Sequence, residues 1–134
     1  MKGSKREEAF RYLYEAELRS DAPPSKLRGR AARIAEGVRA HMATLDEAIS
    51  AASDNWRVTR MAPVDRTIIR IGLYELRFEP KTPLGVILNE AVELAKKYST
   101  EQSGAFVNGV LAALAKTERP DDSTDETVHT AAEQ

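Results

Sequence analysis

The side chains of this sequence that could take part in chemistry fall into two groups far apart along the chain. The first group consists of three cations near the N terminus: Lys2, Lys5 and Arg6. The second group combines two lysines, two amides and an aromatic ring: Lys96, Lys97, Gln102, Phe106 and Asn108. Specific binding of single-stranded RNA combines positive charge with ring stacking and with amides that read base edges. If the two ends of the folded chain meet, the sequence predicts one RNA-binding surface.

A structural role is the alternative for each part of this surface. Charged residues on amphipathic helices commonly form faces that contact only water. Phe106 is offset by one residue from the predicted inner face of its helix, so the sequence leaves open whether the ring is a core anchor or partly exposed. Asn108 is either a surface amide or a buried amide bonded to the backbone.

Residues for catalysis are missing from the pattern. The chain has two histidines, His41 and His129, and the second lies in a polar C-terminal segment. Neither a paired-histidine metal site nor a Ser-His arrangement is therefore available. Asn89, Glu90 and Glu93 lie within about one helical turn, but carboxylates without a metal or histidine partner are usually structural. The glycines are scattered and form no phosphate-binding loop. We therefore predict that the chain is not an enzyme. We expect no catalytic residue, no cofactor and no metal ion.

Length and charge bound the domain organisation. A chain of 134 residues with 42% hydrophobic residues can bury one domain-sized core. Residues 118–134 carry six acids and one base, whereas residues 1–117 carry 19 bases and 15 acids. We predict one mildly basic domain over 1–117 and an acidic, disordered tail over 118–134. Zero cysteines and the lack of a long apolar run favour a cytoplasmic protein.

Helical periodicity dominates the domain, and no segment alternates as a strand does. We expect an all-α fold with five to seven helices. The predicted helices cover about 4–20, 62–78, 83–98 and 99–114, with residues 27–52 forming either one helix or two. Three N-terminal caps are expected: Thr44 and Ser99 as the first residues of capping boxes, and Thr82 before Pro83.

Four motifs together resemble the NusB family of transcription antitermination proteins, over about residues 5–115. The motifs are Asn55–Arg60, Val64–Leu76, Asn89–Lys96 and Phe106–Leu111. The resemblance implies two roughly perpendicular three-helix bundles. It also implies a factor that binds boxA RNA of ribosomal RNA leader transcripts together with NusE, a small-subunit ribosomal protein, and that joins elongating RNA polymerase.

The resemblance also assigns roles by position. The RNA side would include Lys2, Lys5, Arg6, Phe106 and Asn108, because cations hold phosphates and a ring stacks on a base. The partner side would include Tyr14 and Asp65, since an acid with a tyrosine suits a basic ribosomal protein.

Two other functions remain open at this point. A NusB-like domain also precedes the catalytic domain of one family of ribosomal-RNA cytosine methyltransferases, so the chain could be an RNA-binding module of that kind. Alternatively, the chain forms a structural homodimer whose apolar faces pair with each other.

Overall fold

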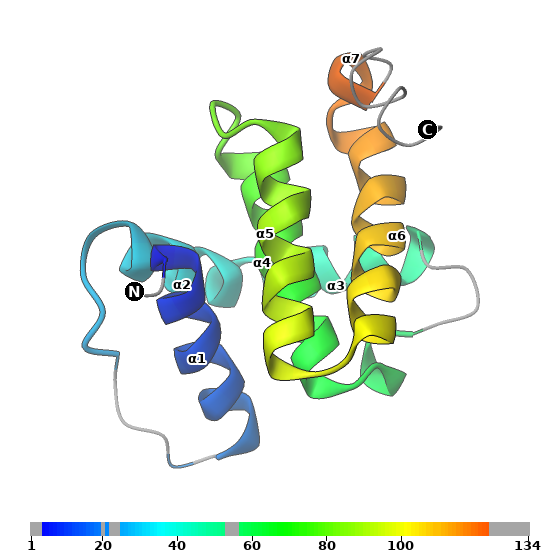
Figure 1. The fold of residues 1–134 in the computed structure, drawn as a ribbon. Helices are drawn as coiled ribbons and strands as arrows, with labels where there is room; N and C mark the ends of the chain where they lie inside the picture. Colours follow the sequence, from blue (N-terminus) through cyan, green and yellow to red (C-terminus); the bar gives the residue numbers. More distant parts are fainter. Residues whose placement is uncertain (1–3, 20, 22–24, 53–56, 124–134) are drawn as a thin grey trace.

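The computed structural model describes residues 4–19, 21, 25–52 and 57–123, and these ranges form seven α-helices and one short 3-10 helix (Figure 1). In chain order the elements are α1 (Lys5–Leu18), α2 (Gly29–Ala40), α3 (Met42–Ala52), η1 (Val58–Arg60), α4 (Pro63–Phe78), α5 (Leu84–Tyr98), α6 (Glu101–Glu118) and α7 (Pro120–Ser123).

Helix α4 is the central element. Ten of its 16 residues are buried, because α4 contacts α1, α2, α3, α5 and α6. A helix that is apolar on most of its circumference requires such neighbours on several sides. In Figure 1, α4, α5 and α6 run side by side, and α1 and α2 lie to one side of them. The predicted all-α fold is confirmed. Helices α1 and α2 pack against each other, and α3 packs mainly on α4 and α6.

The segment for which one helix or two had been expected forms two, α2 and α3. The break lies at His41, whose ring stacks on Phe78 of α4 with 4.5 Å between ring centroids. The capping box expected at Thr44 is wrong, because Thr44 lies inside α3 and its hydroxyl donates to the carbonyl of His41 at 3.1 Å.

Two other helix starts differ from the predicted caps by one residue. Helix α5 begins at Leu84 after Pro83, so Thr82 is not its cap. The cap of α6 is Thr100 and not Ser99, since the Thr100 hydroxyl accepts from the amide of Ser103 at 3.0 Å. Both predictions placed the helix correctly and assigned the cap one residue too early.

The folded part extends past the predicted domain boundary. Helix α6 ends at Glu118, and Arg119 after it is buried, with 9% of its surface exposed. The Arg119 guanidinium donates to the carbonyls of Thr82 (2.6 Å), Glu79 (2.8 Å), Leu76 and Glu75 (both 3.2 Å). It thereby satisfies carbonyls at the C-terminal end of α4. The predicted tail therefore begins too early at 118; residues 124–134 lie outside the described residues.

Two glycines let neighbouring helices approach α4 closely. An ideal Cβ at Gly37 of α2 would lie 2.1 Å from Cε1 of Tyr74, and one at Gly72 of α4 would lie 2.7 Å from both methyl carbons of Leu111. Real atoms do not pack at these distances. The Tyr74 ring therefore occupies the space that a side chain at Gly37 would need.

Candidate nucleic-acid interface

The N-terminal helix and the end of α5 are joined through one carboxylate. Glu7 of α1 accepts from the ammonium of Lys97 at 2.7 Å and from the hydroxyl of Tyr98 at 2.6 Å. The hydrogen bonds from Lys97 and Tyr98 lower the pKa of Glu7 against the opposing effect of its burial. The structure thus brings the first turns of α1 to the C-terminal end of α5, next to the loop that precedes α6.

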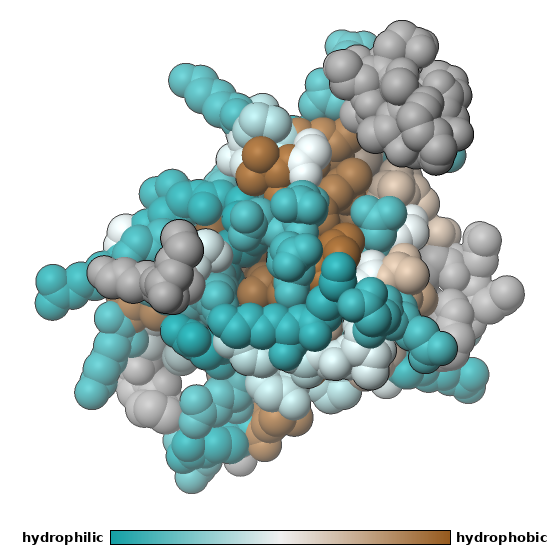
Figure 2. All heavy atoms as spheres, in the orientation of Figure 1, coloured by the Kyte–Doolittle hydropathy of each residue, from teal (hydrophilic) through white to brown (hydrophobic). Residues whose placement is uncertain are grey.

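Four cations on α1 and α5 are called here the cationic cluster: Lys5, Arg11, Lys96 and Lys97. Arg11 and Lys97 pair with Glu7, Lys5 pairs with Glu8, and Lys96 pairs with Glu101. The side chains of Lys5, Arg11 and Lys97 are more than half exposed, and that of Lys96 is 38% exposed. Hydrophilic side chains crowd over α1 and the lower part of α5 (Figure 2). Arg11 was not among the predicted site residues, although its four-residue spacing from Glu7 predicts a contact on one helix face; the two side chains lie 3.7 Å apart.

Arg6 does not belong to this exposed cluster. Its guanidinium donates to both carboxylate oxygens of Glu75, at 2.6 and 2.7 Å, and lies 3.4 Å from Glu90. Arg30 of α2 donates to Glu75 at 2.9 Å and to Glu79 at 2.7 Å. Arg6 is only 5% exposed. The prediction that Arg6 contacts RNA phosphates is therefore wrong, because its donors face a buried carboxylate. Lys2 lies outside the described residues.

A pocket of about 380 Å³ opens at the other end of α4, between α4, η1 and the start of α6. We call it the Asp65 pocket. Asp65 is 8% exposed, and its Oδ1 has no hydrogen-bond partner among the residues that the structure describes. Burial raises the pKa of Asp65, against the opposing effect of the Ser103 hydroxyl. The other lining residues are Arg60, Met61, Ala62, Thr100, Gln102, Ser103 and Phe106.

Two residues predicted for RNA, Gln102 and Phe106, thus share a pocket with Asp65, which had been predicted for a protein partner. Tyr14, the second predicted partner residue, does not line this pocket. Its ring is half-buried and stacks on Phe10 with 5.6 Å between centroids. The structure therefore places Asp65 with the RNA candidates.

Phe106 and Asn108 point to different sides of α6. Phe106 is half-buried and lines the Asp65 pocket, whereas Asn108 is exposed and does not line it. Two steps along an α-helix turn the side-chain direction by about 200°. The buried alternative for Asn108 is excluded, and the ring and the amide do not form a single platform.

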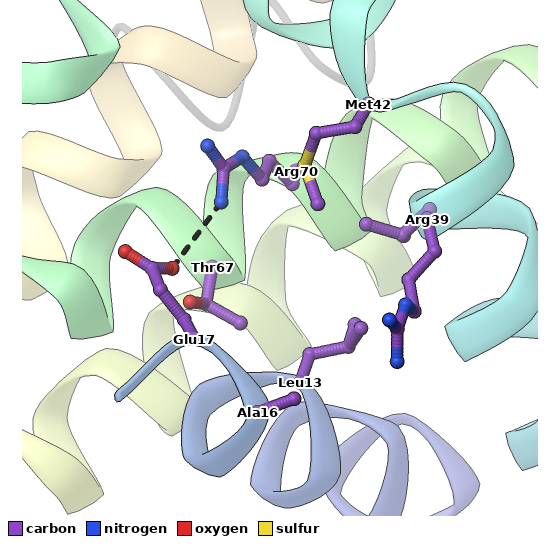
Figure 3. A pocket seen from close by; sticks show the side chains of 8 residues that line it. Leu13, Ala16, Glu17, Arg39, Met42, Thr67 and Arg70 are labelled. Carbon is purple, nitrogen blue, oxygen red and sulfur yellow. Dashed lines mark hydrogen bonds and ion pairs between the residues drawn. The ribbon is translucent and has the colours of Figure 1, made fainter. Parts of the chain in front are cut away.

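A second pocket, of about 170 Å³, lies between α1, α2, α3 and α4 (Figure 3). Its charged groups already have partners: Arg70 donates to Glu17 at 3.3 Å and to both oxygens of Asp46 at 2.7 and 2.8 Å. Arg39 donates to the Tyr12 hydroxyl at 2.7 Å. The arginines that line this pocket are therefore paired within the fold.

The family model that matches this chain is that of the NusB family, and it covers residues 1–116. The chain belongs to the NusB family. NusB proteins are not enzymes, in agreement with the sequence-based prediction. In the described ranges no helix is long and apolar enough to cross a membrane, and no three acidic, histidine or cysteine residues gather as metal ligands.

Individual NusB proteins are similar in sequence and in structure. The transcription antitermination protein NusB of Sorangium cellulosum (strain So ce56) is 54% identical over 89 residues, which are 66% of this chain and 64% of that protein. The chain thus spans less than two thirds of this relative. NusB from T. maritima superimposes with a TM-score of 0.78 at 32% identity, covering 92% of this chain and 99% of that one. A structure of antitermination factors NusB and NusE in complex with dsRNA matches with a TM-score of 0.73 at 28% identity, covering 84% and 94%.

Proposed function

We propose that this chain is a transcription antitermination factor that binds boxA RNA of ribosomal RNA leader transcripts together with NusE and joins elongating RNA polymerase in the cytoplasm. The observation that carries the proposal is the exposed cationic cluster on α1 and α5 in a chain of the NusB family. The match to a solved NusB–NusE–RNA complex supports the two partners.

In this proposal the cations contact RNA phosphates, and the amides and the aromatic ring contact the bases. Lys5, Lys96 and Lys97, with Lys2 before them, hold phosphates and give affinity that depends on salt. Gln102 and Phe106 meet bases at one edge of α6, and the Asn108 amide meets the RNA at the other. Tyr14 serves the NusE side.

Lys97 gives the sharpest test of the phosphate contacts. Lys97→Ala removes a cation and also leaves the carboxylate of Glu7 without its ammonium partner, so affinity should fall for every RNA sequence. The dependence of log affinity on log salt should flatten by about one unit. Fluorescence titration of labelled boxA-like and scrambled RNA, with and without NusE at two salt concentrations, measures both effects.

Lys116→Ala is the matched control, because Lys116 is an exposed lysine near the far end of α6. It should leave affinity and salt dependence unchanged. Equal affinity of the wild-type protein for boxA-like and scrambled RNA in the presence of NusE would contradict the proposed function.

A further inference from the structure

One buried carboxylate, Glu7, contacts cations from two helices. The Glu7 side chain is 8% exposed, and its Oε2 accepts from the Lys97 ammonium at 2.7 Å and lies 3.7 Å from the Arg11 guanidinium. The same oxygen accepts from the Tyr98 hydroxyl at 2.6 Å, and the Tyr98 ring packs on buried Phe10 with 4.8 Å between ring centroids. The core therefore fixes the position of the carboxylate, and the carboxylate restricts both cations.

Both cations keep donors for a ligand. The side chains of Arg11 and Lys97 are 56% and 60% exposed. An ammonium has three N–H donors and a guanidinium has five, so a contact with one carboxylate oxygen leaves most of them unused. Because both cations reach the same oxygen, they are close neighbours. The pKa of Lys97 agrees: its hydrogen bond to Glu7 raises the pKa, while the charge of Arg11 acts in the opposite direction.

The charges of this group indicate what kind of ligand fits it. Two cations and one carboxylate leave one net positive charge, and a phosphodiester carries one negative charge. Phosphate oxygens accept from ammonium and guanidinium groups alike. Long cationic side chains normally lose much conformational freedom when they bind a ligand. Glu7 restricts Arg11 and Lys97 before a ligand arrives, so this loss is smaller.

We infer that Arg11 of α1 and Lys97 of α5 together bind one phosphodiester group of the RNA, and that Glu7 is the positioning residue that holds the two cations for it. We call these three residues the phosphate clamp. The inference rests on the proposed RNA-binding function and deepens it, because it adds Arg11 and an acidic residue to the site. Helix α1 packs mainly on α2 and α4, so the clamp joins α1 to α5 through side chains.

The sign of the effect of Glu7→Gln tests the clamp. If Glu7 acted only through its charge, its removal would lower the repulsion of RNA and strengthen binding. A positioning carboxylate gives the opposite result, because a neutral amide holds the cations less strongly. We expect Glu7→Gln to weaken binding of labelled boxA-like RNA roughly fivefold, since both cations must then be ordered on binding. Fluorescence anisotropy with the full chain, in the presence of NusE, measures the affinity.

Two further variants make the result specific. Arg11→Ala should weaken binding about as much as Lys97→Ala, because the two cations contact the same phosphate. Glu93→Gln makes the same change of charge as Glu7→Gln at an exposed position of α5, one turn before Lys97. It should not weaken binding, since Glu93 takes no part in the clamp.

A double-mutant cycle distinguishes positioning from a general effect on the fold. In a chain that already carries Arg11→Ala and Lys97→Ala, Glu7→Gln should no longer weaken binding, because no cation of the clamp remains to be held. The same fivefold loss in that background would assign Glu7 to the fold alone and would overturn the clamp.

The other outcomes separate the clamp from the proposed function. Tighter binding by Glu7→Gln, or unchanged binding by Arg11→Ala, overturns the clamp and leaves the proposed function standing if the wild-type protein still prefers boxA-like over scrambled RNA. If the wild-type protein binds neither RNA, even with NusE present, the proposed function fails and the clamp is overturned with it.

Discussion

Glu75 and Asp65 are carboxylates on the same helix, α4, and are 0% and 8% exposed respectively. Glu75 has two arginines, Arg6 and Arg30, whose donors lie 2.6 to 2.9 Å from its oxygens. Asp65 lines a pocket, and its Oδ1 has no hydrogen-bond partner among the residues that the structure describes. A buried ion needs hydrogen bonds to offset its lost hydration, so only the first arrangement is complete within the described chain.

The buried carboxylates at the two ends of α4 therefore differ in whether their hydrogen bonds are made within the fold. At the C-terminal end, α1 and α2 are attached to the central helix through Glu75, and Arg119 satisfies the last carbonyls. This end builds the fold. At the N-terminal end, one buried oxygen of Asp65 has no hydrogen-bond partner among the described residues. Burial alone therefore does not decide the role of a charged residue; whether its hydrogen bonds are made within the fold does.

Removing the Glu75 carboxylate at the C-terminal end of α4 should have the largest effect on the free energy of unfolding. Glu75→Ala leaves Arg6 and Arg30 without their shared carboxylate, and Arg6 is 5% exposed. We expect the free energy of unfolding to fall by about 3–5 kcal/mol, the usual cost of removing one partner of a buried pair. Chemical denaturation measures it. Glu36→Ala, at an exposed site on α2, should change the free energy of unfolding by less than about 0.5 kcal/mol. A loss as small for Glu75→Ala would show that the ion network does not hold the helices together.

The close packing at the same end gives a second, smaller test. Gly37→Ala would place a Cβ 2.1 Å from the ring of Tyr74, so the ring must move. We expect a loss of about 1–3 kcal/mol, typical of overpacking. Gly109→Ala in α6 meets nothing within 4 Å and should stabilise by roughly 0.5–1 kcal/mol through helix propensity. Thermal unfolding of both variants measures the contrast, and equal effects would mean that Tyr74 does not press on Gly37.

A substitution of Asp65, at the N-terminal end of α4, should change the free energy of unfolding in the opposite direction. Asp65→Asn removes a buried charge without a full set of partners, and we expect the free energy of unfolding at neutral pH to rise by about 1 kcal/mol. Burial raises the pKa of Asp65 in the folded state, so its favourable contribution is present at low pH and is lost as pH rises through that raised pKa. The variant's advantage should therefore grow from acidic to neutral pH, as measured by denaturation at several pH values. An advantage that shrinks with rising pH would place the carboxylate among partners that stabilise its charge.

Periodicity and turn residues predicted the helices of this fold, because both depend on residues close in sequence. The partners of Arg6 could not be predicted in this way, since Glu75 lies 69 residues further along the chain. A charged residue near a terminus and a charged residue in a buried cluster look alike until the helices are packed. Arg119 was misjudged for the same reason: the acidic segment around it resembles a tail, while its partners lie at the end of α4.

In the candidate site, too, residue types were predictable from the sequence, whereas contacts between distant segments were not. Lys97, Gln102 and Phe106 stood out by residue type, and two of them line the Asp65 pocket. The placement of Asp65 beside them depends on how α4 meets α6, which a single sequence does not specify. The different directions of Phe106 and Asn108, in contrast, follow from helix geometry alone, because residues two positions apart point to opposite sides of a helix.

Glu7 allows a last test of how hydrogen-bond partners change the contribution of a buried carboxylate to stability. The expected change in the free energy of unfolding is the smallest of the series. Its hydrogen bonds from Lys97 and Tyr98 lower its pKa, so its contribution to stability is present at neutral pH and is lost as pH falls through that lowered pKa. The difference in unfolding free energy between wild type and Glu7→Gln should therefore shrink as the solution becomes acidic, opposite in sign to the trend for Asp65→Asn. Denaturation at the same series of pH values measures both. Because the Lys97 side of the contact is exposed, salt should weaken the effect of Glu7→Gln more than that of Glu75→Ala. Parallel pH trends for Glu7 and Asp65 would show that hydrogen-bond partners do not separate these carboxylates.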